Sequence, residues 1–211
     1  LVIGSKNKSS WSLRPWLLLR QSGIAFDEVV IPLDRPETRS SIPKHSPTGK
    51  VPVLKADGLA IWDSLAIAEF IAESHPDRGL WPADRDARAV GRSVSAEMHA
   101  GFQALRQSLP MDFAHSLPMM TIPADAAADI RRIVALWHDC RTRFGAGGPF
   151  LFGRFSVADA MFAPVASRFT TYAVDLAAHG DDGTAQNYRA MMMDLPAMLD
   201  WQAASRRELA A

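Results

Sequence analysis

Short apolar runs separated by polar turns form the pattern of the first part of the chain. Val51-Pro-Val-Leu54 and Leu59 to Trp62 are two such runs, and Asp57-Gly58 between them is a signal for a tight hairpin turn. From Asp63 onward the apolar residues recur at helical spacing, namely Ile67, Phe70 and Ile71. The stretch from Gly49 to Glu73 therefore predicts a strand, a tight turn, a second strand and a helix.

The pattern before this stretch predicts two further strands and a helix. Leu1 to Ile3 is the end of a short apolar strand, and Trp11 to Ser22 has the apolar content of a helix, with Gly23 as its C-terminal cap. Phe26 to Ile31 is rich in β-branched residues and predicts a strand. Pro32 to Pro47 contains four prolines, so we expect a loop with at most one short helix.

The segment from His75 to Asp84 is the best candidate for a domain boundary. Its sequence HPDRGLWPAD places two prolines and a glycine directly after a helical pattern, and these residue types interrupt helices. The prediction is an N-terminal domain over residues 1–75, a linker over 76–84 and a second domain over 85–211.

Beyond the boundary the apolar residues follow helical periodicity, and no segment has the pattern of a strand. A first helical stripe consists of Val90, Val94, Met98, Phe102 and Leu105. A second stripe consists of Ile130, Ile133, Val134, Trp137, Cys140 and Phe144. Two shorter helices are predicted near Ala185 to Met193 and Leu195 to Arg206. The second domain is therefore predicted to be all-helical.

A capping-box pattern precedes one of these helices. Phe155 to Asp159 reads FSVAD, in which Ser156 is followed three positions later by a carboxylate, just before an apolar run. Side chains of this kind satisfy the free N–H groups at a helix start. We expect Ser156 and Asp159 to determine the fold rather than to take part in catalysis.

Composition narrows the function classes. Hydrophobic residues make up 48% and charged residues 22%, as in ordinary soluble globular proteins. The 23 basic and 23 acidic residues give a formal net charge of +0, which argues against a nucleic-acid binder that relies on a general positive field. No apolar run reaches membrane-spanning length and no signal peptide is visible. We expect no nucleic-acid or membrane partner, and a reducing, cytoplasmic location.

Metal and disulfide chemistry are not indicated by the sequence. The single cysteine, Cys140, excludes an internal disulfide framework and a cysteine-based zinc site. The six histidines show no close metal-ligand spacing, so we expect no metal cofactor. Because Cys140 falls on the second helical stripe, we expect it to be a buried apolar residue rather than a reactive thiol.

Pro52 stands at the head of the first strand of the hairpin. Proline cannot donate to a strand ladder, and it is the residue type that tolerates a preceding cis peptide bond. A cis Val51-Pro52 bond would turn the N–H and C=O of Val51 outward, where they could pair with an extended ligand as one more strand would. The sequence permits this isomer.

Asp63 and Ser64 stand at the start of the helix that follows the hairpin. Free N–H groups and the helix dipole make a helix start an anion site. Ser64 adds a hydroxyl group, and the Asp63 carboxylate could hold an ammonium group, so the pair suits the amino-acid end of a small peptide. The alternative is that both residues only cap the helix.

These two segments resemble the glutathione-binding half of the cytosolic glutathione transferases. The resemblance is carried by SPTGKVPVL over residues 46–54 and by WDSLAIAEF over residues 62–70. It implies a thioredoxin-like α/β domain followed by an all-α domain, and it covers essentially the whole chain. Glutathione is the implied co-substrate.

The resemblance assigns residues to the glutathione site. It implies that the backbone of Val51 binds the cysteinyl part of glutathione and that Lys50 contacts the glycyl carboxylate. It implies that Asp63 and Ser64 hold the γ-glutamyl end. The family more often has Glu where this chain has Asp63.

The loop from Ser9 to Arg14 reads SSWSLR and resembles the Ser-Ser-Cys-Ser-Trp-Arg motif of the zeta class. The match implies that Ser9 is the hydroxyl that stabilises the glutathione thiolate and that Ser10, the second candidate, binds the ligand beside it. The alternative is that these serines only cap the following helix. Trp11 stands where the zeta class has Cys, which weighs against its maleylacetoacetate isomerase chemistry.

The implied function is a serine-type glutathione transferase that conjugates glutathione thiolate to an electrophilic small molecule, and the implied assembly is a homodimer. The alternatives are a glutathione-dependent cis-trans isomerase and a non-catalytic binding module of the same fold. The apolar substrate would lie against the all-helical domain. Candidates for that site lie in a segment broken by prolines: Met111, Phe113, His115, Met119 and Met120. The alternative for each of them is an ordinary core or dimer contact.

Overall fold

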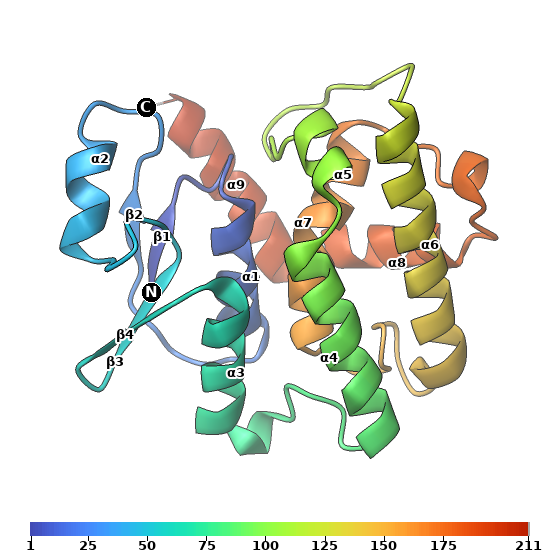
Figure 1. The fold of residues 1–211 in the computed structure, drawn as a ribbon, viewed down its shortest axis with the longest axis horizontal. Helices are drawn as coiled ribbons and strands as arrows, with labels where there is room; N and C mark the ends of the chain where they lie inside the picture. The colour runs from blue at the N-terminus through green and yellow to red at the C-terminus, as the bar shows by residue number, and fades with distance from the viewer. Residues whose placement is uncertain (211) are drawn as a thin grey trace.

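The computed structural model describes residues 1–210 and contains a four-stranded mixed sheet. Its strands are β1 (Val2–Gly4), β2 (Val29–Ile31), β3 (Val53–Ala56) and β4 (Leu59–Trp62). Their order in the sheet is β2-β1-β3-β4, with β2 parallel to β1 and with β3 antiparallel to β1 and β4. The sheet lies at one side of the molecule and most of the helices lie at the other (Figure 1).

The helices of the first domain are α1 (Ser10–Gln21), α2 (Thr38–Ser41) and α3 (Ser64–Ser74), with a 3-10 turn η1 (Ile42–Lys44) directly after α2. The resulting order, with a parallel β-α-β unit followed by a hairpin and a helix, confirms the predicted thioredoxin-like arrangement. Gly23 has a φ of 66° after α1, which confirms it as the C-terminal cap.

The predicted strand over Phe26 to Ile31 is too long. Only Val29–Ile31 pairs with β1, because β1 itself consists of three residues and its last partner, Gly4, lies opposite Ile31. The hairpin turn is as predicted: Asp57 and Gly58 have φ values of 51° and 80°, and positive φ at both central residues is what a two-residue turn of this twist requires. Its first strand, predicted over Val51 to Leu54, instead spans Val53–Ala56.

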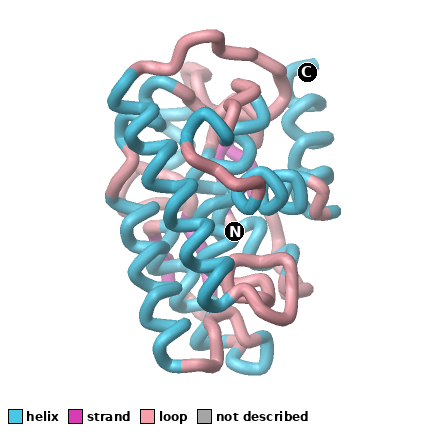
Figure 2. Tube along the Cα trace, turned by 90° about the vertical axis from the view of Figure 1, so that its right-hand side faces the viewer, coloured by secondary structure: helices cyan, strands magenta, loops and turns pink. Residues whose placement is uncertain are grey.

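The second domain is helical, as predicted. Its helices are α4 (Arg85–Ala100), α5 (Gln103–Ser108), α6 (Ala124–Phe144), α7 (Val157–Thr171), α8 (Thr184–Met193) and α9 (Pro196–Ala210), with 3-10 turns η2 (Pro76–Arg78) before them and η3 (Ala177–His179) among them. Figure 2 shows these helices lying side by side in front of the sheet. The last residue of the predicted domain, Ala211, lies outside the described residues.

The first apolar stripe does not belong to one helix. Helix α4 ends at Ala100, Phe102 has a left-handed φ of 59°, and α5 begins at Gln103. The Arg106 side chain donates to the carbonyl oxygens of Met98 and Gly101 and so satisfies the free acceptors at the end of α4. The prediction of a continuous stripe is wrong here because the helical spacing of apolar residues continues through a break in the helix at Gly101 and Phe102.

One continuous core joins the two domains. Leu13 and Leu17 of α1 are fully buried in it together with Phe162 and Phe169 of α7. Helix α9 returns to the first domain, where the indole of Trp201 donates to the carbonyl oxygen of Lys6 at 2.8 Å. The relative position of the sheet and the helices is therefore fixed by buried packing.

The Ser156–Asp159 capping box is present and fully buried, as predicted. The N–H and the hydroxyl of Ser156 each donate to Asp159 Oδ2 at 2.9 Å. The Leu151 N–H and the Tyr188 hydroxyl each donate to Asp159 Oδ1 at 3.0 Å. Burial nevertheless outweighs these donors and raises the pKa of Asp159 to about 6. The carboxylate holds several segments together and faces no cavity.

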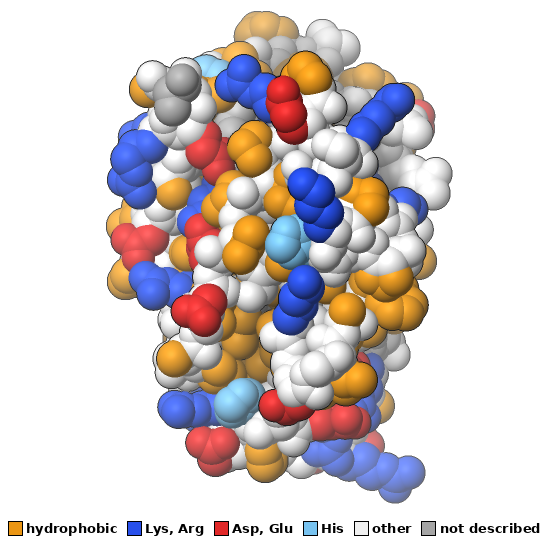
Figure 3. Space-filling view, turned by 90° about the vertical axis from the view of Figure 1, so that its left-hand side faces the viewer, with side chains coloured by type: hydrophobic (Ala, Val, Ile, Leu, Met, Phe, Trp, Pro, Cys, Tyr) orange, Lys and Arg blue, Asp and Glu red, His pale blue; other side chains and the backbone are white. Residues whose placement is uncertain are grey.

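On the face of the molecule that Figure 3 displays, basic and acidic side chains are interspersed with apolar ones. This face therefore carries no large field of one sign. Within residues 1–210, no helix combines the length and the apolar composition that a membrane span requires.

Candidate functional site

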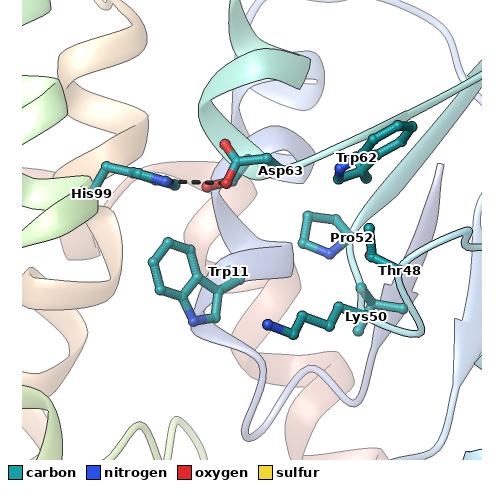
Figure 4. Close-up of a pocket in the computed structure, with 9 residues that line it drawn as sticks. Trp11, Thr48, Lys50, Pro52, Trp62, Asp63 and His99 are labelled. Atoms are coloured by element: carbon teal, nitrogen blue, oxygen red, sulfur yellow. Dashed lines mark ion pairs between the residues drawn. The ribbon is translucent and has the colours of Figure 1, made fainter.

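A cavity of about 470 Å³ opens between the first domain and α4 (Figure 4). The residues that line it are Trp11, Thr48, Lys50, Val51, Pro52, Trp62, Asp63, Ser64 and His99. Four of these are residues that the sequence predicted for a ligand site: Lys50, Val51, Asp63 and Ser64. Loops and helix ends from three separate stretches of the chain therefore meet around one space.

One wall of the cavity is the loop that leads into β3. Its peptide bond between Val51 and Pro52 is cis, and no loop or side-chain hydrogen bond within residues 1–210 uses the N–H or C=O of Val51. The buried Oγ of Ser46 accepts from the Lys50 N–H at 3.2 Å and so stabilises the conformation of the loop. The backbone at Val51 is therefore positioned and has hydrogen-bonding capacity to spare.

Asp63 is both a helix cap and a cavity residue. It has a φ of 73°, and its Oδ1 accepts from the N–H groups of Leu65 at 2.9 Å and Ala66 at 3.3 Å. Its Oδ2 lies 3.0 Å from Nε2 of His99, which comes from α4. The capping and ligand-binding roles that the sequence left open as alternatives are therefore compatible in one side chain.

Ser64 connects the cavity to a buried cation. The Ser64 hydroxyl oxygen accepts from Arg14 Nη1 at 3.3 Å, and both residues are buried. Burial is the main cause that lowers the pKa of Arg14, and the nearby cations Arg106 and Arg168 act in the same direction. Two nitrogens of Arg14, Nε and Nη2, have no partner among the described residues. This positive charge behind the start of α3 favours an anion on the cavity side of Ser64.

Trp11 forms a further wall of the cavity and is itself flanked by cations. The guanidinium groups of Arg14 and Arg106 lie 4.3 and 4.8 Å from its ring centre, and the His99 ring meets it edge-on at 5.2 Å. Sequence reasoning missed both Trp11 and His99 as cavity residues. Trp11 lies in the serine loop and so had a local signal, whereas nothing in the spacing of His99 marked it.

The structure places the two candidate serines just outside the cavity lining. Ser9 precedes α1, and its hydroxyl donates to Ser12 Oγ at 2.7 Å, which in turn accepts from the Gly4 N–H at 3.0 Å. Ser9 occupies the N-cap position of α1, but its side chain makes no capping hydrogen bond to the helix. Ser10 is the first residue of α1 and is also buried.

The segment considered for the apolar substrate does not line this cavity. Met111 and Phe113 are buried in the core, and the Phe113 N–H donates to the carbonyl oxygen of Asn7. His115 Nδ1 lies 2.8 Å from Asp112 Oδ1, and Met120 is 98% exposed. This segment instead braces the loop that leads to Ser9.

Within residues 1–210, neither the cysteine nor a cluster of metal-binding side chains lies at the cavity. Cys140 is buried, as predicted, and burial raises the pKa of its thiol to about 12. Among the described residues, no group of three or more His, Cys, Asp or Glu side chains could hold a metal ion. The lining of the cavity does include side chains of both charge signs, Lys50 and Asp63.

Two protein-family models match the chain. They are described as the glutathione S-transferase N-terminal domain, over residues 8–74, and the glutathione S-transferase C-terminal domain, over residues 96–204. The second model alone spans more than half of the chain. Together they cover the loop of Ser9, the whole cavity and most of the helices.

Curated relatives match over part of their length. A probable maleylacetoacetate isomerase of Caenorhabditis elegans is 35% identical over 49% of this chain and 49% of its own length. The maleylacetoacetate isomerase of Rattus norvegicus is 34% identical over 50% of each chain. A glutathione S-transferase of Dianthus caryophyllus is 27% identical over 52% of this chain and 49% of its own. The matched segment thus spans about half the length of these relatives.

Solved structures share the whole fold. A glutathione transferase homologue from Burkholderia with bound glutathione has a TM-score of 0.70 at 20% identity and covers 98% of this chain and 97% of its own. A glutathione S-transferase from the clam Laternula elliptica has a TM-score of 0.73 at 20% identity, with coverage of 95% and 90%. At this identity the comparison establishes the fold: a thioredoxin-like domain followed by an all-helical domain.

Proposed function

The chain belongs to the glutathione S-transferase family, and from that premise we propose that its cavity binds glutathione and that the protein promotes attack of the glutathione thiolate on a small electrophile. The observation that carries this proposal is that Lys50, Val51, Asp63 and Ser64 line one cavity. Their groups match the parts of a γ-glutamyl tripeptide in order along the cavity wall.

The amino-acid end of glutathione carries one ammonium and one carboxylate group. Asp63 supplies a carboxylate for the ammonium group. Ser64 supplies a hydroxyl and a backbone N–H for the carboxylate at the start of α3, where the helix dipole and the buried Arg14 both favour an anion. Because Arg14 donates to Ser64 Oγ, the hydroxyl hydrogen of Ser64 is left to point at the ligand.

The middle and the glycyl end of glutathione fit the loop before β3. The unused N–H and C=O of Val51 pair with the cysteinyl backbone, as an added strand would. The Lys50 side chain reaches the glycyl carboxylate from the same loop. The cysteinyl sulfur then lies toward the start of α1.

Ser9 is the proposed donor to the sulfur, with Ser10 as the second candidate. The Ser9 hydroxyl donates to Ser12 Oγ, and rotation of this hydroxyl toward the ligand would exchange that hydrogen bond for one to the thiolate. A hydrogen bond to the charged form of a thiol lowers its pKa, and the dipole of α1 acts in the same direction. The thiolate would then form the new C–S bond with the electrophile.

A second candidate function is glutathione-dependent cis-trans isomerisation, because several relatives carry the name maleylacetoacetate isomerase. In that reaction the thiolate adds to a double bond, rotation follows, and elimination returns the thiolate unchanged. Glutathione is consumed in the transferase reaction and conserved in the isomerase reaction. The site proposed here serves both, since each needs a bound thiolate.

The experiment that tests the proposal measures binding and turnover in parallel. Calorimetry with glutathione should give a one-site isotherm that weakens in Asp63→Ala. Incubation with an activated aryl halide and with a cis-configured unsaturated diacid, with glutathione assayed before and after, separates conjugation from isomerisation. Binding without turnover of either substrate class would favour a non-catalytic module, and absence of glutathione binding would refute the proposal.

The assembly and location of the protein remain predictions. A homodimer is tested by sedimentation of the purified protein, and a cytoplasmic location is tested by fractionation of the source cells. The domain limits at 1–75, 76–84 and 85–211 likewise stay predictions.

A further inference from the structure

Asp63 receives a contact from the helical domain. His99 lies in the last turn of α4, and its Nε2 is 3.0 Å from Asp63 Oδ2 (Figure 4). Both side chains line the cavity, so their contact is part of its wall. The carboxylate proposed to bind the ligand's ammonium group is therefore contacted by residues of both domains.

We propose that His99 is a positioning residue for the amino-acid end of glutathione: it donates to Asp63 and holds the carboxylate in the orientation that receives the ligand's ammonium group. The inference rests on the proposed function and adds to it a specificity residue that belongs to the helical domain.

The hydrogen bonds of Asp63 leave a defined place for an ammonium group. A carboxylate accepts about four hydrogen bonds, two at each oxygen. Oδ1 already accepts from the N–H groups of Leu65 and Ala66, and Oδ2 accepts from His99. The remaining acceptor position is on Oδ2, and its direction is fixed because the other positions are occupied.

The state of His99 suits this role. Burial is the main cause that lowers the pKa of His99. The positive charges of Arg14 and Arg106 lower it further, whereas the Asp63 carboxylate raises it. Nδ1 of His99 is buried and has no partner among the described residues, so a hydrogen on Nδ1 would be an unsatisfied donor. A neutral ring with its hydrogen on Nε2 satisfies Asp63 and places no second cation beside the ligand's ammonium group.

The position of His99 is itself fixed by its surroundings. The Arg106 guanidinium donates to the carbonyl oxygens of His99 and Gly101 at the end of α4. The Trp11 ring meets the His99 ring edge-on at 5.2 Å. Arg106 thus fixes the backbone at His99, and Trp11 packs against its ring, so that the His99 side chain can orient Asp63.

The test compares two ligands across three proteins by calorimetry at neutral pH. The ligands are glutathione and glutaryl-cysteinyl-glycine, which lacks only the ammonium group. The proteins are the wild type, His99→Leu and His99→Gln, since the glutamine amide can donate from about the place of Nε2. We expect His99→Leu to weaken glutathione binding about tenfold, as the loss of a hydrogen bond to a charged group implies.

The same substitution should leave the affinity for the analogue unchanged, and His99→Gln should recover most of the loss with glutathione. His138→Leu is the matched control. His138 Nε2 lies 3.3 Å from Asp182 Oδ2, away from the cavity, so its removal should change neither affinity.

Two results would overturn the inference while leaving the proposed function intact. In the first, His99→Leu lowers the affinity for both ligands equally, which indicates a general structural role. In the second, His99→Leu changes the affinity for neither ligand, although the wild type binds glutathione. A wild type that fails to bind glutathione refutes the proposed function itself and the role of His99 with it.

Discussion

Two helix starts in this molecule use the same residue types for opposite purposes. At the start of α7, Ser156 and Asp159 are buried and donors from the protein meet both carboxylate oxygens. At the start of α3, Asp63 and Ser64 line a cavity, and the contacts of Asp63 leave one acceptor position of its carboxylate unoccupied. The lesson is that a serine and an aspartate at a helix start indicate function only when their hydrogen-bonding capacity is not exhausted by the fold.

The largest expected effect is on stability and comes from Asp159→Ala. The substitution leaves four donor contacts from Leu151, Ser156 and Tyr188 without their buried acceptor. We expect the free energy of unfolding to fall by about 3–5 kcal/mol, measured by urea denaturation. Asp63→Ala is the comparison and should lose about 1 kcal/mol, as for an ordinary helix cap. Equal losses in the two variants would contradict the distinction between the two helix starts.

The pH dependence of stability gives the next largest effect. Burial raises the pKa of Asp159 to about 6, whereas an aspartate in an unfolded chain titrates near about 3.9. Between these values the folded state keeps a proton that the unfolded state has lost, so the free energy of unfolding should fall as pH rises from about 4 to about 6. The decrease should be about 2–3 kcal/mol.

Asp159→Asn removes this titration and serves as the control. Denaturation series over the same pH range should give a smaller slope for the variant than for the wild type. Parallel slopes would mean that Asp159 ionises in the folded protein as it does in the unfolded chain.

A smaller effect, on ligand affinity, is expected from Asp63→Ala. Loss of a hydrogen-bonded carboxylate from the cavity should weaken glutathione binding about 10- to 100-fold. Asp159→Asn, in contrast, should leave the affinity unchanged where the protein is folded, because Asp159 faces no cavity. Calorimetry on both variants checks this, and a large loss of affinity in Asp159→Asn would show that the two sites are not independent.

The sequence predicted the elements whose signals are local. The periodicity from Ile130 to Phe144 lies in α6, and Asp57-Gly58 forms the hairpin turn. The prediction was wrong for the stripe that ends at Leu105, because the spacing of apolar residues does not reveal that the helix is interrupted at Phe102. An interruption of one or two residues is too short to alter a helical pattern of apolar residues.

The residues of the candidate site also fall into two groups, those with a local signal in the sequence and those without one. Lys50, Val51, Asp63 and Ser64 lie in one stretch of the chain, so a motif identified them together. His99 reaches the cavity only because α4 packs beside α3, and its local sequence carries no sign of that contact. Side chains that tertiary packing delivers to a site are the part that sequence reasoning misses.

A glutathione thiolate held by this fold would be detected by the ultraviolet absorbance of bound glutathione, measured against pH. Free thiols of this kind titrate at about pH 8.5. We predict a clearly lower pKa for the bound thiol in the wild type and a return toward the free value in Ser9→Ala. A return in Ser10→Ala alone would transfer the role of donor to Ser10. A bound thiol that titrates as the free one does, in the wild type, would contradict the account.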